Sequence, residues 1–135
     1  MRFMVLVKAN KESEAGVLPT AEQLAEMGAF NEELAKAGVL LAMDGLQATS
    51  KGARIKFTGG KPAVTDGPFT ETKELVAGFW IVQGKSKQEV VERMSRAPFE
   101  NGEIEIRQIF EAEDFGENLP ADVREQEERL RAQLQ

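Results

Sequence analysis

The segment Thr65–Glu74, TDGPFTETKE, contains the densest group of side chains that could do chemistry. Asp66 and Glu71 are carboxylates of the type that serve as general acids or bases. Lys73 and Glu74 add a cation and a further anion close by. We expect this cluster to lie at the mouth of a cavity, with Asp66 or Glu71 as candidate catalytic residues.

A structural role for Asp66 is the alternative to a catalytic one. An Asp before Gly usually accepts the amide of the residue two positions on, but that residue is Pro68, which has no N–H. We therefore expect Asp66 to bind the amide of Phe69 or Thr70, or to point elsewhere. The sequence leaves both roles open.

Five side chains are candidate ligand contacts. An aromatic ring can stack on a ligand, and a cation can hold an anion, but each type also has a structural use. The aromatic residues can pack in a core or an interface, and the charged ones can protect a strand edge or form weak surface pairs. The candidates are Arg54, Phe69, Lys73, Glu74 and Trp80.

Histidine, cysteine and tyrosine are all absent from the 135 residues. The absence of cysteine excludes disulfides and thiolate metal sites, and the absence of histidine removes the commonest neutral-pH base and metal ligand. We expect no metal site, no cofactor and a cytoplasmic location. Whether the chain is an enzyme at all stays uncertain from these residues.

The formal net charge of −6 is concentrated near the C-terminus, where residues 111–135 hold eight acidic and three basic side chains. No basic stripe interleaved with aromatics is present, so we expect no nucleic-acid partner. The apolar stretch at the N-terminus, MRFMVLV, is too short to span a membrane, and we expect no membrane association.

Two helices and six strands are expected before the C-terminal tail from the apolar periodicity. The first helix should run from Ala21 to Ala37, after the capping pair Thr20 and Gln23 and before Gly38. The second should begin after Ser86 and end before Pro98. The strands are expected at Arg2–Lys8, Val39–Thr49 with a bulge or bend at Asp44-Gly45, Ala53–Thr58, Lys61–Thr65, Leu75–Val82 and Glu103–Phe110.

This order predicts an α+β chain with the split βαβ pattern of ferredoxin-like folds, an antiparallel sheet and a β-hairpin inserted around Gly59-Gly60. Two helices cover one face of such a sheet, yet both faces of Arg2–Lys8 and Leu75–Val82 are apolar. Because a large exposed apolar face is unusual, we expect a second copy to cover it, giving a homodimer. The C-terminal segment folded back over the sheet is the alternative.

Residues 117–135 are expected to form an acidic, helical tail with a thin apolar stripe, separate from a domain at residues 1–116.

The segment VTDGPFTETKELVAGFWIV, a helix ending in AP, and GEIEIRQIFEAEDFG together resemble YCII-related proteins of the DGPF type. The resemblance implies a ferredoxin-like subunit in a dimeric α+β barrel. In the wider family, enzymatic roles have been suspected for a histidine–aspartate pair, which this histidine-free chain does not contain. DGPF proteins are often encoded near alternative sigma factors, and the resemblance therefore implies a transcription-factor partner.

Three functional hypotheses follow. The first is a homodimer that binds a small polar molecule in an inter-subunit cavity near the DGPF loop. The second is an acid–base enzyme of isomerase, lyase or hydrolase type that uses Asp66 or Glu71, with Lys73 or Arg54 stabilising an anion. The third is a regulatory interaction module linked to transcription.

Overall fold

The computed structural model describes residues 1–134, which form four α-helices, six β-strands and three short 3₁₀ helices. In chain order these elements are β1 (Arg2–Lys8), α1 (Lys11–Glu14), α2 (Ala21–Lys36), β2 (Leu40–Gly45), η1 (Thr49–Lys51), β3 (Ala53–Thr58), β4 (Lys61–Asp66), η2 (Thr72–Glu74), β5 (Val76–Gln83), α3 (Lys87–Met94), β6 (Ile104–Gln108), η3 (Ala112–Asn118) and α4 (Ala121–Gln133).

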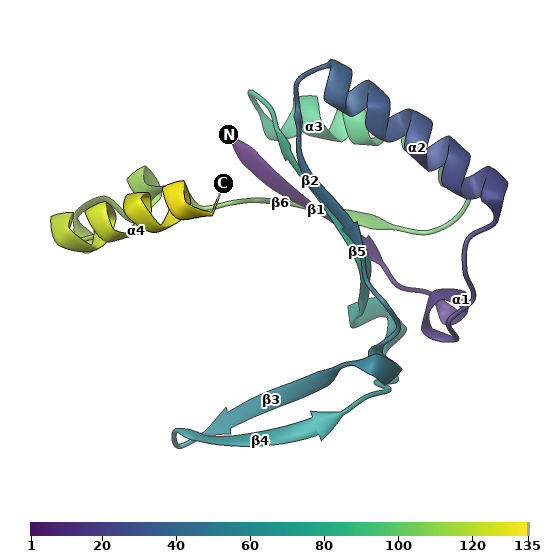
Figure 1. Ribbon diagram of the computed structural model, residues 1–135, viewed down its shortest axis with the longest axis horizontal. Helices are drawn as coiled ribbons and strands as arrows, with labels where there is room; N and C mark the ends of the chain where they lie inside the picture. The colour runs from purple at the N-terminus through teal and green to yellow at the C-terminus, as the bar shows by residue number, and fades with distance from the viewer. Residues whose placement is uncertain (135) are drawn as a thin grey trace.

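A four-stranded antiparallel sheet with the order β2-β5-β1-β6 forms the centre of the fold. Helices α2 and α3 lie on one side of this sheet (Figure 1). Strands β3 and β4 form a separate two-stranded sheet. The predicted α+β, ferredoxin-like fold with an inserted hairpin and a C-terminal helix is confirmed.

Local sequence signals determine where helix α2 begins and ends. The Thr20 hydroxyl accepts the Gln23 amide at 3.1 Å, and the Gln23 side chain accepts the Thr20 amide at 2.9 Å. This is the expected capping box. At the other end, Gly38 has a φ of 74°, a conformation that glycine adopts without steric cost.

Three local details differ from the expectations. The register of β2 shifts between Leu40 and Ala42, and not at Asp44-Gly45, where the strand simply ends. The short helix α1 was not expected, although Asn10 and Ser13 form a capping box at its start. The last strand, predicted at Glu103–Phe110, spans only Ile104–Gln108.

The core lies between the sheet and the two covering helices. Sheet residues that face the helices alternate with residues that face away, and only the first set is fully buried. An edge-on contact joins Phe30 to Trp80, with 5.9 Å between ring centroids. The core residues are Phe3, Val5, Phe30, Leu34, Trp80, Val82, Val90 and Met94.

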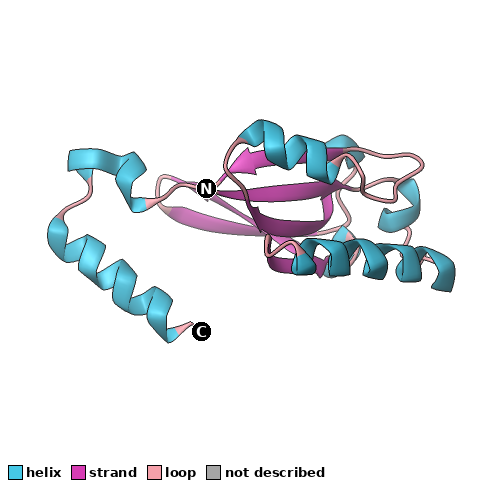
Figure 2. Ribbon diagram, turned by 90° about the horizontal axis from the view of Figure 1, so that it is seen from above, coloured by secondary structure: helices cyan, strands magenta, loops and turns pink. Residues whose placement is uncertain are grey.

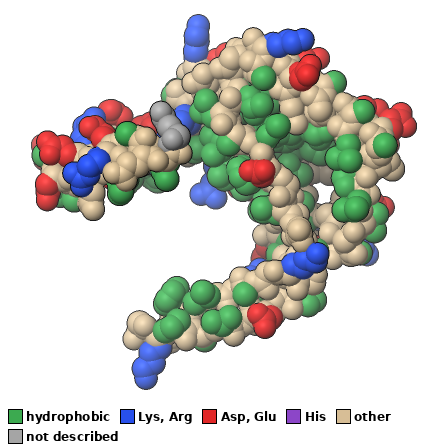
Figure 3. Space-filling model, viewed as in Figure 1, with side chains coloured by type: hydrophobic (Ala, Val, Ile, Leu, Met, Phe, Trp, Pro, Cys, Tyr) green, Lys and Arg blue, Asp and Glu red, His purple; other side chains and the backbone are tan. Residues whose placement is uncertain are grey.

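The hairpin β3–β4 projects away from the central sheet, on the side opposite the helices (Figure 1). Gly59 and Gly60 both have positive φ, as the predicted tight turn requires. In the hairpin register Ile55 opposes Val64 and Phe57 opposes Pro62, so these side chains share one face. Phe57 is 68% exposed, and hydrophobic side chains gather on the side of the hairpin that borders the open concave space (Figure 3).

The C-terminal segment, η3 and α4, extends from the end of the sheet beyond β6 (Figure 2). Glu111, the residue directly before η3, accepts two hydrogen bonds from Arg2. The distances are 2.7 Å from Nε and 3.2 Å from Nη2. Arg124 joins the two parts of the segment through an ion pair with Glu113 at 3.1 Å. Within residues 1–134, no helix has the length and apolar character needed to cross a membrane.

Candidate functional site

The DGPF loop, Asp66–Phe69, is attached to the turn η1. The Gly67 amide donates to the Gly52 carbonyl at 3.0 Å. The backbones approach so closely that a β-carbon on Gly67 would lie 1.8 Å from the Thr49 carbonyl oxygen, far inside van der Waals contact. Pro68 follows through a cis peptide bond. The glycine of the motif is therefore required by the close approach of two chain segments.

Thr49 connects the DGPF loop to helix α1. Its hydroxyl accepts the Phe69 amide at 3.0 Å and donates to the Glu14 carboxylate at 2.5 Å. The Thr49 amide donates to the other oxygen of Glu14 at 3.1 Å. Three segments far apart in the sequence therefore meet where the hairpin leaves the sheet, and we call Glu14, Thr49, Gly67 and Phe69 the hairpin joint.

Two of the predicted ligand contacts meet at this joint. The guanidinium carbon of Arg54 lies 3.8 Å from the centre of the Phe69 ring, a cation–π contact. Phe69 is half-buried and Arg54 is exposed. The pair presents a positive charge beside the DGPF loop.

Asp66 lies at the end of β4, opposite Ala53, and is exposed. One of its two expected partners, the Phe69 amide, binds Thr49 instead. The carboxylate of Asp66 therefore does not close the loop by binding that amide.

Glu71, Lys73 and Glu74 are also exposed, at or within the 3₁₀ turn η2. This turn leads directly to the end of β1, because the Ala9 amide donates to the Leu75 carbonyl at 2.9 Å. Residues 1–134 contain no group of three or more acidic side chains arranged to hold a metal ion.

Trp80 lies apart from the other candidates, on the helix-covered face of β5. It is 4% exposed, and its indole nitrogen donates to the Asn31 side-chain oxygen at 2.8 Å. Phe30 and Phe99 make edge-on contacts with its ring. The structure therefore places Trp80 in the core, at some remove from the DGPF loop.

The helix-free face of the sheet combines apolar and charged side chains. Met4 opposes Ile81 and Leu6 opposes Phe79 in the β1–β5 register, and these four side chains are half-buried. On the same face the sheet register places Glu105 beside Leu6.

A row of charges borders these apolar side chains. The Glu105 carboxylate lies 3.3 Å from the Lys8 ammonium and 3.8 Å from the Arg107 guanidinium. None of these three residues was among the predicted site residues. The alternation of apolar and charged residues along β6 predicts that Glu105 and Arg107 share a face. The contact between Glu105 and Lys8, however, depends on the β1–β6 register.

Comparison with known proteins gives a relative and a solved structure. An uncharacterized protein of Rhizobium meliloti is 30% identical over 87 residues, which cover 62% of this chain and 70% of that protein. The structure is 5-chloro-2-hydroxyhydroquinone dehydrochlorinase of Burkholderia phenoliruptrix in complex with 2,5-dihydroxybenzoquinone. It aligns with a TM-score of 0.46 and 16% identity, over 84% of this chain and 98% of its own. The profile of the YCII-related domain matches residues 1–113, and the chain belongs to the YCII-related family.

Proposed function

We propose that this YCII-related protein forms a homodimer through the helix-free face of its sheet and binds a small polar molecule between the subunits. The single observation that supports this most strongly is the half-buried apolar set Met4, Leu6, Phe79 and Ile81, over which no helix of residues 1–134 lies. Burial of such side chains stabilises a complex in proportion to the apolar area removed from water.

The position of the hairpin supports a second copy as the cover. Its exposed residues Ile55, Phe57 and Val64 share one face of the hairpin, and hydrophobic side chains gather on the side of the hairpin that borders the open concave space (Figure 3). The alternative cover, the C-terminal segment, extends away from the sheet in both ribbon views (Figures 1 and 2). A second copy contributes another sheet and another hairpin, and so covers both surfaces at once.

The charged residues at the edge of this face give the proposed ligand its polar character. Lys8, Glu105 and Arg107 form a connected row on the face, and η2 brings Lys73 and Glu74 to the same end of β1. In a dimer these groups border a space between two sheets, where reduced solvent strengthens their interaction with a polar ligand. Arg54 and Phe69 beside the DGPF loop complete the proposed site.

Sedimentation across a range of protein concentrations tests the dimer. We expect a dimer at micromolar concentration, and a particle that stays monomeric at high concentration would contradict the proposal. A thermal-shift screen with small polar metabolites tests binding, with the double variant Lys8→Met and Arg107→Met as the comparison. A ligand that stabilises both proteins equally would place its site elsewhere.

An acid–base reaction at Asp66 is the second candidate function. The observation in its favour is that Asp66 is exposed while Thr49 takes the Phe69 amide, so the hairpin joint does not depend on that bond. Glu71 and Lys73 lie a few residues on and supply a second carboxylate and a cation. Asp66→Asn should leave the melting temperature nearly unchanged and abolish any turnover found in a substrate screen. Loss of the fold in this variant would identify Asp66 as structural.

A further inference from the structure

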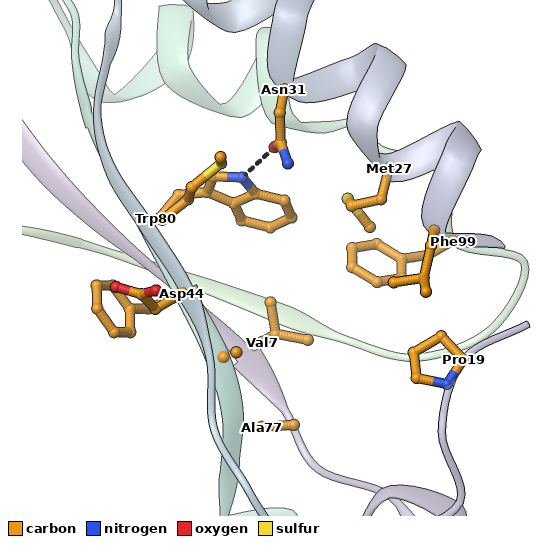
Figure 4. A pocket seen from close by; sticks show the side chains of 13 residues that line it. Val7, Pro19, Met27, Asn31, Asp44, Ala77, Trp80 and Phe99 are labelled. Carbon is orange, nitrogen blue, oxygen red and sulfur yellow. Dashed lines mark hydrogen bonds between the residues drawn. The ribbon is translucent and has the colours of Figure 1, made fainter. Parts of the chain in front are cut away.

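A cavity lies on the helix-covered side of the sheet, between α2 and strands β1, β2 and β5 (Figure 4). Its volume is about 430 Å³, within the range of small-molecule pockets. Its walls are largely apolar and include Val7, Pro19, Leu24, Met27, Met43 and Phe99.

The rim of this pocket exposes large apolar side chains to solvent. Leu24 is 59% exposed, Met43 46% and Phe99 39%. Three such side chains around one concavity form a surface that gains free energy when an apolar guest covers it. Thioether and aromatic groups also adapt well to ring-shaped guests.

One polar group in the pocket has a fixed orientation. The Trp80 indole N–H can only donate, and it donates to Asn31 Oδ1 at 2.8 Å. This bond fixes the orientation of the Asn31 side-chain amide. Its Oδ1 is occupied by the indole, and its Nδ2 remains as a hydrogen-bond donor. Figure 4 shows the Asn31 nitrogen on the pocket side of the bond. The pocket therefore offers a hydrogen-bond donor at a defined place among apolar walls.

Among residues 1–134, no ionisable side chain is placed in the pocket so that it could pair with a charged guest. Asp44 is the one ionisable residue of this described part of the chain in the lining. In the β2–β5 register it opposes Phe79 on the helix-free face, and Figure 4 shows its carboxylate on the far side of β2 from the Trp80 ring. A charged guest would lose hydration without gaining a counter-ion. The geometry favours a neutral guest.

We infer that this pocket binds a compact, uncharged, mainly apolar molecule with one hydrogen-bond acceptor, such as an aryl ketone. The ring lies against Met27, Leu24 and Phe99, and the carbonyl oxygen accepts from Asn31 Nδ2. The site goes beyond the proposed function, because it is complete within one subunit and lies on the other face of the sheet.

The Trp80 indole N–H gives a direct readout, because Trp80 is the only tryptophan and its N–H signal is single in a ¹H–¹⁵N spectrum. Titration with acetophenone should shift this signal and saturate. Ethylbenzene, which has similar size and no oxygen, should bind about fivefold more weakly, the value of one neutral hydrogen bond. Equal affinity for the two probes, or no saturable shift up to the solubility limit, would overturn the inference.

Asn31→Asp is the matched variant, because a carboxylate still accepts the Trp80 N–H but offers no donor to the guest. It should reduce acetophenone affinity to or below the level of ethylbenzene, because the carboxylate repels the carbonyl oxygen, and it should reduce ethylbenzene affinity less. Leu24→Arg, at the exposed rim, should weaken the binding of both probes. It is the second test variant if Asn31→Asp fails to fold. Retained acetophenone affinity in both variants would contradict the site.

The proposed dimer and the proposed pocket can be tested independently of each other. The variant Phe57→Ser alters the hairpin, outside the pocket, and is designed to weaken dimerisation. Acetophenone should bind this variant with wild-type affinity. If dimerisation and binding were lost together, the pocket would depend on the second copy and the inference of a complete site in one subunit would be wrong.

Discussion

Gly67 and Thr49 lie so close together that any β-carbon on Gly67 would fall 1.8 Å from the Thr49 carbonyl oxygen. Gly52 lies near the same carbonyl group. A β-carbon on Gly52, however, would lie 3.6 Å from the Thr49 oxygen, which is an ordinary van der Waals distance. The DGPF motif therefore has a structural requirement that is independent of any ligand.

Gly67→Ala should lower the free energy of unfolding by about 2 kcal/mol or more, since two backbone segments must move apart. Gly52→Ala is the control and should change it by no more than about 0.5 kcal/mol. Urea unfolding followed by circular dichroism measures both. Equal stability of the two variants would mean that the loop relaxes freely and that the contact is unimportant.

Thr49→Val should destabilise the hairpin joint. Valine keeps the shape but removes the oxygen that accepts the Phe69 amide and donates to Glu14, and the expected cost is about 1–3 kcal/mol. Thr65→Val, on the exposed strand β4, is the matched control and should have little effect. If both variants unfold at the same urea concentration, the Thr49 hydrogen bonds contribute no net stability.

The Arg2–Glu111 pair predicts a pH dependence of stability. Hydrogen bonding from Arg2 lowers the pKa of Glu111 and raises the pKa of Arg2. The Glu111 contribution is complete above the carboxyl pKa of the unfolded chain, about 4.3, and is lost as pH falls through the lower folded pKa. The Arg2 contribution is lost only at strongly alkaline pH.

Glu111→Gln should therefore be less stable than the wild type at pH 7, and this difference should shrink as the pH falls below about 4. Urea unfolding at a series of pH values measures the effect, with Glu117→Gln as the charge-matched control. A destabilisation by Glu111→Gln that is the same at pH 7 and pH 3 would show that the ion pair is not its source.

Phe57→Ser should weaken the proposed dimer while preserving the fold of each subunit. The ring is largely exposed in the single chain, so its loss costs little within the subunit but removes apolar contact with a second copy. We expect the dissociation constant to rise about tenfold or more in sedimentation equilibrium. Lys56→Ser, on the other face of the hairpin, should leave it unchanged.

Removal of residues 117–135 should leave the domain folded. The Arg2–Glu111 contact is retained in the shortened chain, and no residue of α4 is buried. The melting temperature should change by no more than about 3 °C. A large fall in a thermal melt would show that the tail belongs to the folded unit and that the boundary near residue 116 is wrong.

The elements that follow local rules could be read from the sequence. Thr20 and Gln23 determine the start of α2 within one helical turn, and Gly59-Gly60 determines the hairpin turn. These signals act over a few residues, so no tertiary information was needed. The strand order then followed from the split βαβ pattern.

The contacts of the candidate site depend on long-range approach and could not be read in this way. Thr49 meets Glu14 across 35 positions and Phe69 across 20. Asn31 meets Trp80 across 49 positions, so the sequence did not reveal that the Trp80 indole has a polar partner in the core. The row formed by Lys8, Glu105 and Arg107 likewise required the strand register.

In the described part of the chain, strands β3 and β4 pair only with each other, and a two-stranded ribbon has little stability alone. Its amide protons should therefore exchange rapidly with deuterium in dilute solution, ahead of those in the central sheet. If a second copy lies against the ribbon, exchange at Ile55 and Val64 should slow as the protein is concentrated. The exchange rate of the hairpin amides would then report the fraction of the protein that is dimeric.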